Sequence, residues 1–126
     1  MTIPLFKFNE KMNTDDMLKC HLYFSCIKKG FIPEKGEVEL LIYLYNFGPI
    51  DSKEKNKEFL KTSVDKGIRA SEASARNVLS KYTYYNILIK EGNSKRRFNY
   101  DIVPKDINSC VFQYFITNFD LHDNRT

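Results

Sequence analysis

The chain has 126 residues, 42% hydrophobic and 29% charged, which is the composition of a globular protein and argues against a disordered or fibrous one. Its length predicts a single domain, residues 1–126, with a modest core. A formal net charge of +4 is too small to demand a nucleic-acid partner. No segment approaches the roughly 18 continuous apolar residues of a membrane span, and the opening MTIPLFKFNEK does not have the pattern of a signal peptide. We therefore expect an intracellular protein with no membrane partner.

Few side chains suggest catalysis or metal binding. Cys20, Cys26 and Cys110 form no CxxC pair and no zinc-type cluster, so we expect buried small hydrophobic residues in a reducing compartment. His21 and His122 do not have the spacing to nucleophiles or carboxylates that a triad or metal site would suggest. The five glycines are scattered at turns and make no phosphate-binding motif. We expect no enzymatic activity, no cofactor and no metal site.

The chain begins with a predicted N-terminal arm, residues 1–16, followed by an alternating segment within residues 17–30. Apolar and polar side chains there exchange at every second position, which predicts a half-buried strand flanking the domain. The apolar members are Leu18, Cys20, Leu22, Phe24 and Cys26. Leu18, Leu22 and Cys26 also lie at helical spacing, so a helix is the competing interpretation.

A first helix is predicted to open at Pro33, where the missing N–H costs nothing. An apolar stripe with spacing of three and four residues follows, and it indicates one buried face. Gly48-Pro49 is expected to end the helix. The stripe consists of Val38, Leu41, Ile42 and Tyr45.

Two further helices are predicted from their capping residues. Asp51 or Ser52 caps a mostly solvent-facing second helix, and Ser71 caps a third. The second helix has few apolar side chains, namely Phe59, Leu60 and Val64. The third has an inner face of Ala75, Val78, Leu79 and Tyr82.

A β-hairpin is predicted after the third helix. Ile87–Ile89 is a compact β run, residues 91–94 are a turn by composition, and residues 96–100 return as the second strand. Residues 31–100 therefore predict an α+β domain of the winged helix-turn-helix type, with three helices and a hairpin wing. Residues 101–126 complete the chain as a C-terminal strand, CVFQYFITNF at 110–119, and a polar tail.

Basic residues concentrate on the third helix and the wing. The segment from Arg69 to Arg97 contains seven lysines and arginines and two glutamates, which gives it a local charge of +5. A helix over 72–83 fits a DNA major groove, and a basic wing at 92–97 can lie along phosphates. Candidate contacts to double-stranded DNA, or to another partner, are Arg69, Ser74, Arg76, Asn77, Lys81, Lys95, Arg96 and Arg97. Glu72 lies at the same end of the helix and weakens this interpretation.

A protein interface is the other prediction. The aromatic segments at 17–27 and 110–119 exceed what a winged-helix core needs, and aromatic side chains are typical of stable interfaces. Tyr23, Tyr114 and Phe119 are the candidate contacts.

The stretch IPEKGEVELLIYLYNFGPID followed by SEASARNVLSKYTYYNILIKEG resembles small winged-helix-like proteins of Bacteroidetes tailed phages, the crAss-like group. The matching positions are Pro33 and Glu37 in the first helix, and Asn77 before Leu79 in the third. The resemblance spans roughly residues 32 to 100. The chain departs from the pattern at Asn86, where winged helices often place glycine.

This resemblance implies a non-enzymatic virion component, such as a head-tail connector, neck or ring protein, made in the cytoplasm of a bacterial host. Its partners would be other virion proteins and copies of itself closing a ring-like assembly. The alternative is a small cytoplasmic winged-helix regulator that binds double-stranded DNA.

Overall fold

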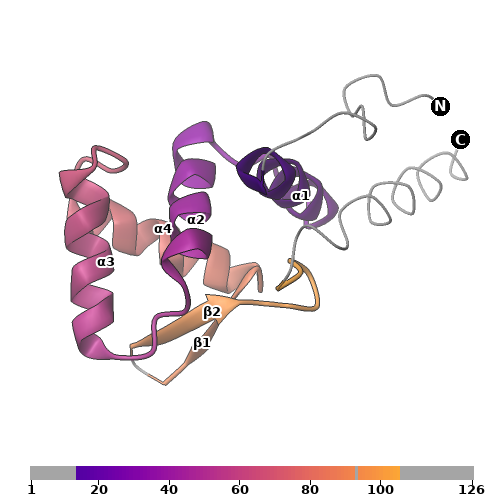
Figure 1. Ribbon diagram of the computed structural model, residues 1–126. Coiled ribbons are helices and arrows are strands. Elements are labelled where there is room, and N and C mark those ends of the chain that lie inside the picture. The colour runs from indigo at the N-terminus through magenta and orange to yellow at the C-terminus, as the bar shows by residue number, and fades with distance from the viewer. Residues whose placement is uncertain (1–13, 93, 106–126) are drawn as a thin grey trace, which may run out of the picture.

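The computed structural model describes residues 14–92 and 94–105, which form four helices and one antiparallel hairpin (Figure 1). The α+β class predicted from the sequence is confirmed for this part of the chain. The predicted strand at 110–119, with Cys110, Tyr114 and Phe119, lies outside the described residues, as do residues 1–13 of the predicted arm. The elements are α1 Thr14–Lys28, α2 Lys35–Phe47, α3 Lys53–Asp65, α4 Glu72–Tyr84, β1 Leu88–Glu91 and β2 Lys95–Phe98.

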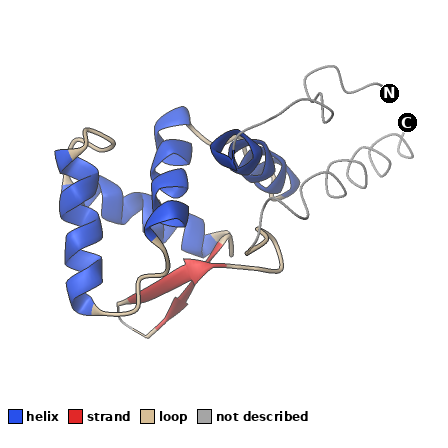
Figure 2. Ribbon diagram, viewed as in Figure 1, coloured by secondary structure: helices blue, strands red, loops and turns tan. Residues whose placement is uncertain are grey.

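The helices pack in sequence around one core, α1 on α2, α2 on α3 and α3 on α4. The hairpin packs on α4 through β1, and Figure 2 shows it below the helices. Side chains from the helices, the hairpin and the turn after it are fully buried in this core, and burying each large aliphatic one contributes about 1.5–3 kcal/mol. They include Leu22, Leu41, Phe59, Leu79, Leu88 and Val103.

The segment predicted as a flanking strand is the helix α1, so that prediction was wrong. Its buried positions include Leu18, Leu22 and Cys26, the helical spacing of the competing interpretation. The alternation fails because it requires His21 and Ser25 to face solvent, whereas both are buried with them. Ser25 Oγ donates to the His21 carbonyl at 2.9 Å, so the helix supplies the partner that a buried hydroxyl needs.

His21 joins α1 to the turn that follows the hairpin. Its side chain is fully buried, and its Nε2 lies 2.7 Å from the carbonyl oxygen of Ile102. Burial lowers the pKa of this imidazole, and the hydrogen bond to Ile102 opposes that effect only partly. His21 is therefore held mainly in its neutral form at neutral pH.

We expect this burial to make the protein less stable in mild acid. The folded-state pKa lies below the ordinary value of 6.5, so the unfolded chain binds the proton more readily. The contribution is present above pH 6.5 and is lost as the pH falls through the folded-state pKa. Urea unfolding between pH 7.5 and about pH 5 measures this loss. A His21→Gln variant should lose less stability over that range, and an equal loss would refute the assignment.

The ends of α2 follow local backbone rules. Gly48 has φ 97°, a left-handed conformation that glycine adopts easily, and its N–H donates to Leu44 O at 3.0 Å. The predicted stop at Gly48-Pro49 is confirmed. The predicted start is two residues early: α2 begins at Lys35 with Glu34 as N-cap, and Pro33 precedes the cap.

Serine caps begin α3 and α4 as predicted. Ser52 Oγ accepts a hydrogen bond from the backbone N–H of Lys55, and Ser71 Oγ accepts one from that of Ser74. Between the two alternatives for α3, Ser52 is the cap. Asp51 instead lies 3.7 Å from Lys55 in an exposed ion pair.

The hairpin pairs Leu88 with Phe98 and Glu91 with Lys95. The predicted second strand, 96–100, is displaced. β2 ends at Phe98 because the carbonyl of Asn99 accepts hydrogen bonds from the N–H groups of Ile102 and Val103, which turns the chain.

Two features before the hairpin fix its position. Ile50, between α2 and α3, forms a bridge with Arg96 through two backbone hydrogen bonds of 2.9 Å. Asn86 adopts φ 63°, the left-handed conformation that asparagine tolerates better than most residues, and its carbonyl accepts from Asn99 Nδ2 at 2.9 Å. Asparagine therefore makes the turn at the position where winged helices often place glycine.

Candidate nucleic-acid interface

The outer face of α4 carries a stripe of exposed side chains, which is polar except for Ala73. Its inner face is buried as predicted, whereas Ala73, Arg76, Asn77 and Ser80 are all exposed. Among the described residues, the side chains of Arg76 and Asn77 make no hydrogen bond or ion pair. Ala73 and Ser80 are short, so a flat or grooved partner can approach the helix backbone closely between the longer side chains.

Arg69 is used inside the fold. Its Nε and Nη2 donate to Ser74 Oγ at 2.9 and 2.5 Å, which ties the turn before α4 to the first turn of that helix. A Cβ placed on Gly36 would lie 3.2 Å from Arg69 Nη1, so the guanidinium group also lies over the start of α2. Both predicted contact residues, Arg69 and Ser74, are thus half-buried partners of each other.

Lys81 is also held by the protein. Its Nζ donates to Glu37 Oε1 at 2.9 Å and to Oε2 at 3.2 Å, and Tyr82 donates its hydroxyl to Oε1 at 2.8 Å. Nζ lies 5.4 Å from the centroid of the Phe31 ring, within the range of a cation–π contact. This network joins α4 to α2 and takes Lys81 out of the outer stripe.

The Glu37 network changes the proton affinity of its members. Burial alone raises the pKa of Glu37, but the hydrogen bonds from Lys81 and Tyr82 outweigh it and hold the pKa below its ordinary value. Burial and the Glu37 carboxylate raise the pKa of Tyr82. Cys26 lies in the same region, and burial followed by the charge of Glu37 raises the pKa of its thiol to about 12. Cys26 is buried in the core, as the sequence predicted, whereas Cys20 is only half-buried.

The three basic residues of the predicted wing have different environments. Lys95 is exposed, whereas Arg96 is half-buried and burial lowers the pKa of its guanidinium. Arg97 Nε donates to Glu91 at 3.0 Å, and its guanidinium lies 5.3 Å from the Tyr100 ring centroid. Lys90 of β1 is exposed and was missed by the prediction. Alternation along β1 places Lys90 on the same face as the buried Leu88, so the strand pattern gave no signal for its exposure.

Positive charge is segregated along the chain. Residues 53–98, which contain α3, α4 and the hairpin, have twelve lysines and arginines against five acidic residues, a net charge of +7. All other residues of the chain together sum to −3. A contiguous segment with a net positive charge favours an anionic partner through long-range attraction.

The other predicted site residues lie elsewhere or outside the described ranges. Tyr23 is half-buried on α1, and Tyr114 and Phe119 are not described. Within residues 14–92 and 94–105, no three His, Cys, Asp or Glu side chains gather to hold a metal ion. In the same ranges no helix combines the length and apolar character needed to span a bilayer.

Large apolar side chains are exposed at one end of α4, and sequence patterns did not single them out. Ile32 is 76% and Tyr84 79% exposed. Phe31 stacks on Tyr85 at 4.2 Å between ring centroids, and Tyr85 meets Tyr84 edge-on at 5.2 Å. Ile32, Tyr84 and Tyr85 thus extend from the connection between α1 and α2 to the end of α4.

Comparison with known proteins adds no relative: no family model, no curated protein and no solved structure matches this chain. The resemblance to winged-helix-like proteins of crAss-like phages therefore stays a prediction.

Proposed function

We propose that this protein is a non-enzymatic binding module of the winged helix-turn-helix type, and that α4 and the hairpin bind double-stranded nucleic acid. The order of elements supports the fold assignment: α2, the bridging Ile50, α3, α4 and then the hairpin follow one another as in a winged helix. In this assignment α4 is the recognition helix, β1 and β2 are the wing, and α1 is an addition before the unit.

The observation that carries the nucleic-acid proposal is the segregation of charge. Residues 53–98, which contain α3 as well as the proposed binding elements, carry +7, and the rest of the chain carries −3. Such a field attracts phosphates and orients the protein during association. Arg76 and Asn77 then lie on the outer stripe with the side-chain chemistry that reads guanine and adenine edges. Lys90 and Lys95 supply exposed cations on the hairpin.

Internal contacts limit the size of this interface. Arg69, Lys81 and Arg97 are each engaged within the protein, so they orient the helix and the hairpin and leave phosphate binding to the exposed cations. We therefore expect moderate affinity that depends on few phosphate contacts.

The wild-type protein should bind a labelled duplex of mixed sequence at low salt. Because each neutralised phosphate releases counterions, affinity should fall by about tenfold or more between about 50 and 200 mM salt. Fluorescence anisotropy titrations at several salt concentrations measure this slope. Absence of duplex binding at the lowest salt, or an affinity independent of salt, would rule the proposal out.

The second candidate is the structural subunit of a tailed-phage virion that the resemblance implies. The exposure of Ile32 and Tyr84 beside the stacked pair Phe31 and Tyr85 supports a docking role, because exposed aromatic residues often anchor protein contacts. The same preparation distinguishes the candidates when its native mass is measured. A single large assembly of fixed stoichiometry without duplex binding would favour the subunit, and a monomer or dimer would count against it.

A further inference from the structure

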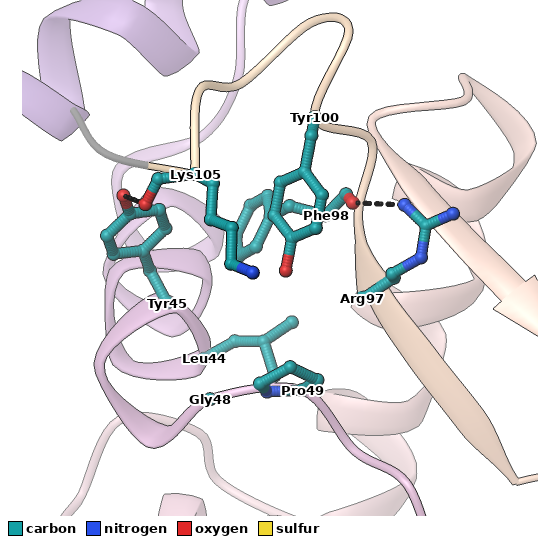
Figure 3. A pocket seen from close by; sticks show the side chains of 8 residues that line it. All are labelled: Leu44, Tyr45, Gly48, Pro49, Arg97, Phe98, Tyr100 and Lys105. Atoms are coloured by element: carbon teal, nitrogen blue, oxygen red, sulfur yellow. Dashed lines mark hydrogen bonds between the residues drawn. The ribbon is translucent and has the colours of Figure 1, made fainter.

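A small pocket lies between the end of α2 and the chain that follows β2. Its volume is about 220 Å³, and Leu44, Gly48 and Pro49 line one side of it (Figure 3). Phe98 and Tyr45 form apolar walls, and their rings meet edge-on at 5.6 Å. A Cβ on Gly48 would meet nothing within 4 Å, which agrees with open space above this residue. No residue of α4 lines the pocket, so it is separate from the proposed nucleic-acid surface.

The far wall of the pocket is held in place by hydrogen bonds. Tyr45 donates its hydroxyl to the carbonyl oxygens of Pro104 and Lys105, at 3.1 and 2.6 Å. The turn at Asn99 and the complete burial of Val103 fix the same segment against the core. Because these contacts already hold the loop in place, a ligand would not have to order it on binding.

The pocket is cationic. Arg97 and Lys105 lie on either side of the Tyr100 ring, with Arg97 Cζ at 5.3 Å and Lys105 Nζ at 5.8 Å from its centroid. Glu91 neutralises Arg97 but does not line the pocket, and within residues 14–92 and 94–105 no other acidic side chain lines it. Among the described residues, the Lys105 ammonium group and the Tyr100 hydroxyl make no hydrogen bond or ion pair.

Figure 3 shows that the free polar ends of these two side chains point the same way. The Lys105 nitrogen and the Tyr100 oxygen both reach into the space above Leu44 and Pro49. An ammonium donor and a hydroxyl donor thus converge over an apolar floor. Both residues are exposed at the rim of the pocket, and two donors that converge on one point can bind a carboxylate or phosphate oxygen there.

We propose that this pocket binds a small organic anion, in which a carboxylate or phosphate group is attached to a compact apolar body. The anionic group accepts hydrogen bonds from Lys105 and Tyr100, and the apolar body covers Leu44 and Pro49. The volume holds about seven waters at about 30 Å³ each and is smaller than the pockets of drug-sized ligands. A single ring or short branched chain with one anionic group therefore fills it, whereas inorganic phosphate leaves the floor uncovered.

Isothermal titration of the full chain with benzoate and phenyl phosphate tests this proposal, with benzamide and inorganic phosphate as matched probes. We expect saturable binding of one or both aromatic anions with a dissociation constant in the range of about 1 mM or tighter. Benzamide, which has the same ring without the charge, should bind much more weakly. Inorganic phosphate, which has the charge without the ring, should also bind much more weakly than the aromatic anions.

Variants identify the site. Lys105→Gln should weaken binding of the aromatic anion by about tenfold or more, because a charge-assisted hydrogen bond is lost, and Tyr100→Phe should weaken it several-fold. Lys28→Gln, at an exposed lysine at the end of α1 outside the pocket, is the control and should bind as the wild type does. Both pocket side chains are outside the core, and circular dichroism verifies that each variant is folded. No saturation by about 10 mM, equal binding of benzamide or inorganic phosphate, or unchanged binding by Lys105→Gln would overturn the assignment.

Discussion

Replacing Arg76 with alanine is expected to weaken duplex binding by about 5- to 150-fold, the range that corresponds to losing one good contact to a base edge. Arg76 is exposed on the outer stripe of α4, and its guanidinium has no partner among the described residues. The folded protein therefore loses no internal contact with this substitution. Anisotropy titrations with the same duplex, at one low salt concentration, compare the two proteins directly.

The salt dependence of the Arg76→Ala variant separates two roles for this side chain. If Arg76 binds a phosphate, the variant should bind all sequences more weakly, and its salt slope should fall by about one. If it contacts a base, the slope should stay nearly unchanged and the preference between sequences should relax. Lys28→Ala is the matched control, because Lys28 is an exposed cation at the end of α1, outside residues 53–98. A loss of affinity as large in Lys28→Ala as in Arg76→Ala would show that only net charge matters and would contradict the assignment of α4.

Replacing Glu37 with alanine is expected to lower the free energy of unfolding by about 2–4 kcal/mol. The carboxylate is only 7% exposed and accepts hydrogen bonds from both Lys81 and Tyr82. Without it, the buried Tyr82 hydroxyl loses its acceptor and a cavity opens between α2 and α4. The loss should be nearer the lower value, because the Lys81 side chain is 37% exposed and can turn its charge toward water.

Urea unfolding at pH 7 measures this effect, with Glu39→Ala as the control. Glu39 is exposed on the same helix, so its removal should change stability by no more than about 0.5 kcal/mol. Equal stabilities of the two variants would show that the Glu37 network does not hold α4 on α2.

The pH dependence gives the Glu37 assignment an independent check. Its folded-state pKa is below the ordinary value of 4.5, so the unfolded chain binds a proton more readily. The stability that the carboxylate contributes is present above pH 4.5 and is lost as the pH falls through the folded-state pKa. A Glu37→Gln variant should lack this acid-dependent loss. The window lies below that of His21, whose contribution begins to fall at about pH 6.5.

Local features were readable from the sequence where one residue type determines the backbone. Gly48 ends α2, and Ser52 and Ser71 begin α3 and α4, because capping depends on a side chain and the few residues next to it. The inner face of α4 was predicted for the same kind of reason, since helical spacing of Val78 and Leu79 is independent of distant partners.

The α1 segment shows why local pattern was insufficient elsewhere. Its residues satisfy both a period of two and a helical spacing, so the sequence alone did not choose between strand and helix. The choice depends on the surface that the segment covers. Helical α1 packs on α2 and places His21 beside Ile102, which is 81 residues away in the chain.

For the candidate interface, too, the sequence determined one part and the tertiary structure decided the other. By itself, the sequence determined the order of α2, α3, α4 and the hairpin and the excess of positive charge over residues 53–98, because both follow from residue types and their spacing. Only the tertiary structure decided which charges remain available. Arg69, Lys81 and Arg97 meet Ser74, Glu37 and Glu91 inside the fold, whereas Arg76, Lys90 and Lys95 stay exposed. The physical reason is that the pairing of a charge depends on three-dimensional proximity, and Glu37 is 44 residues from Lys81.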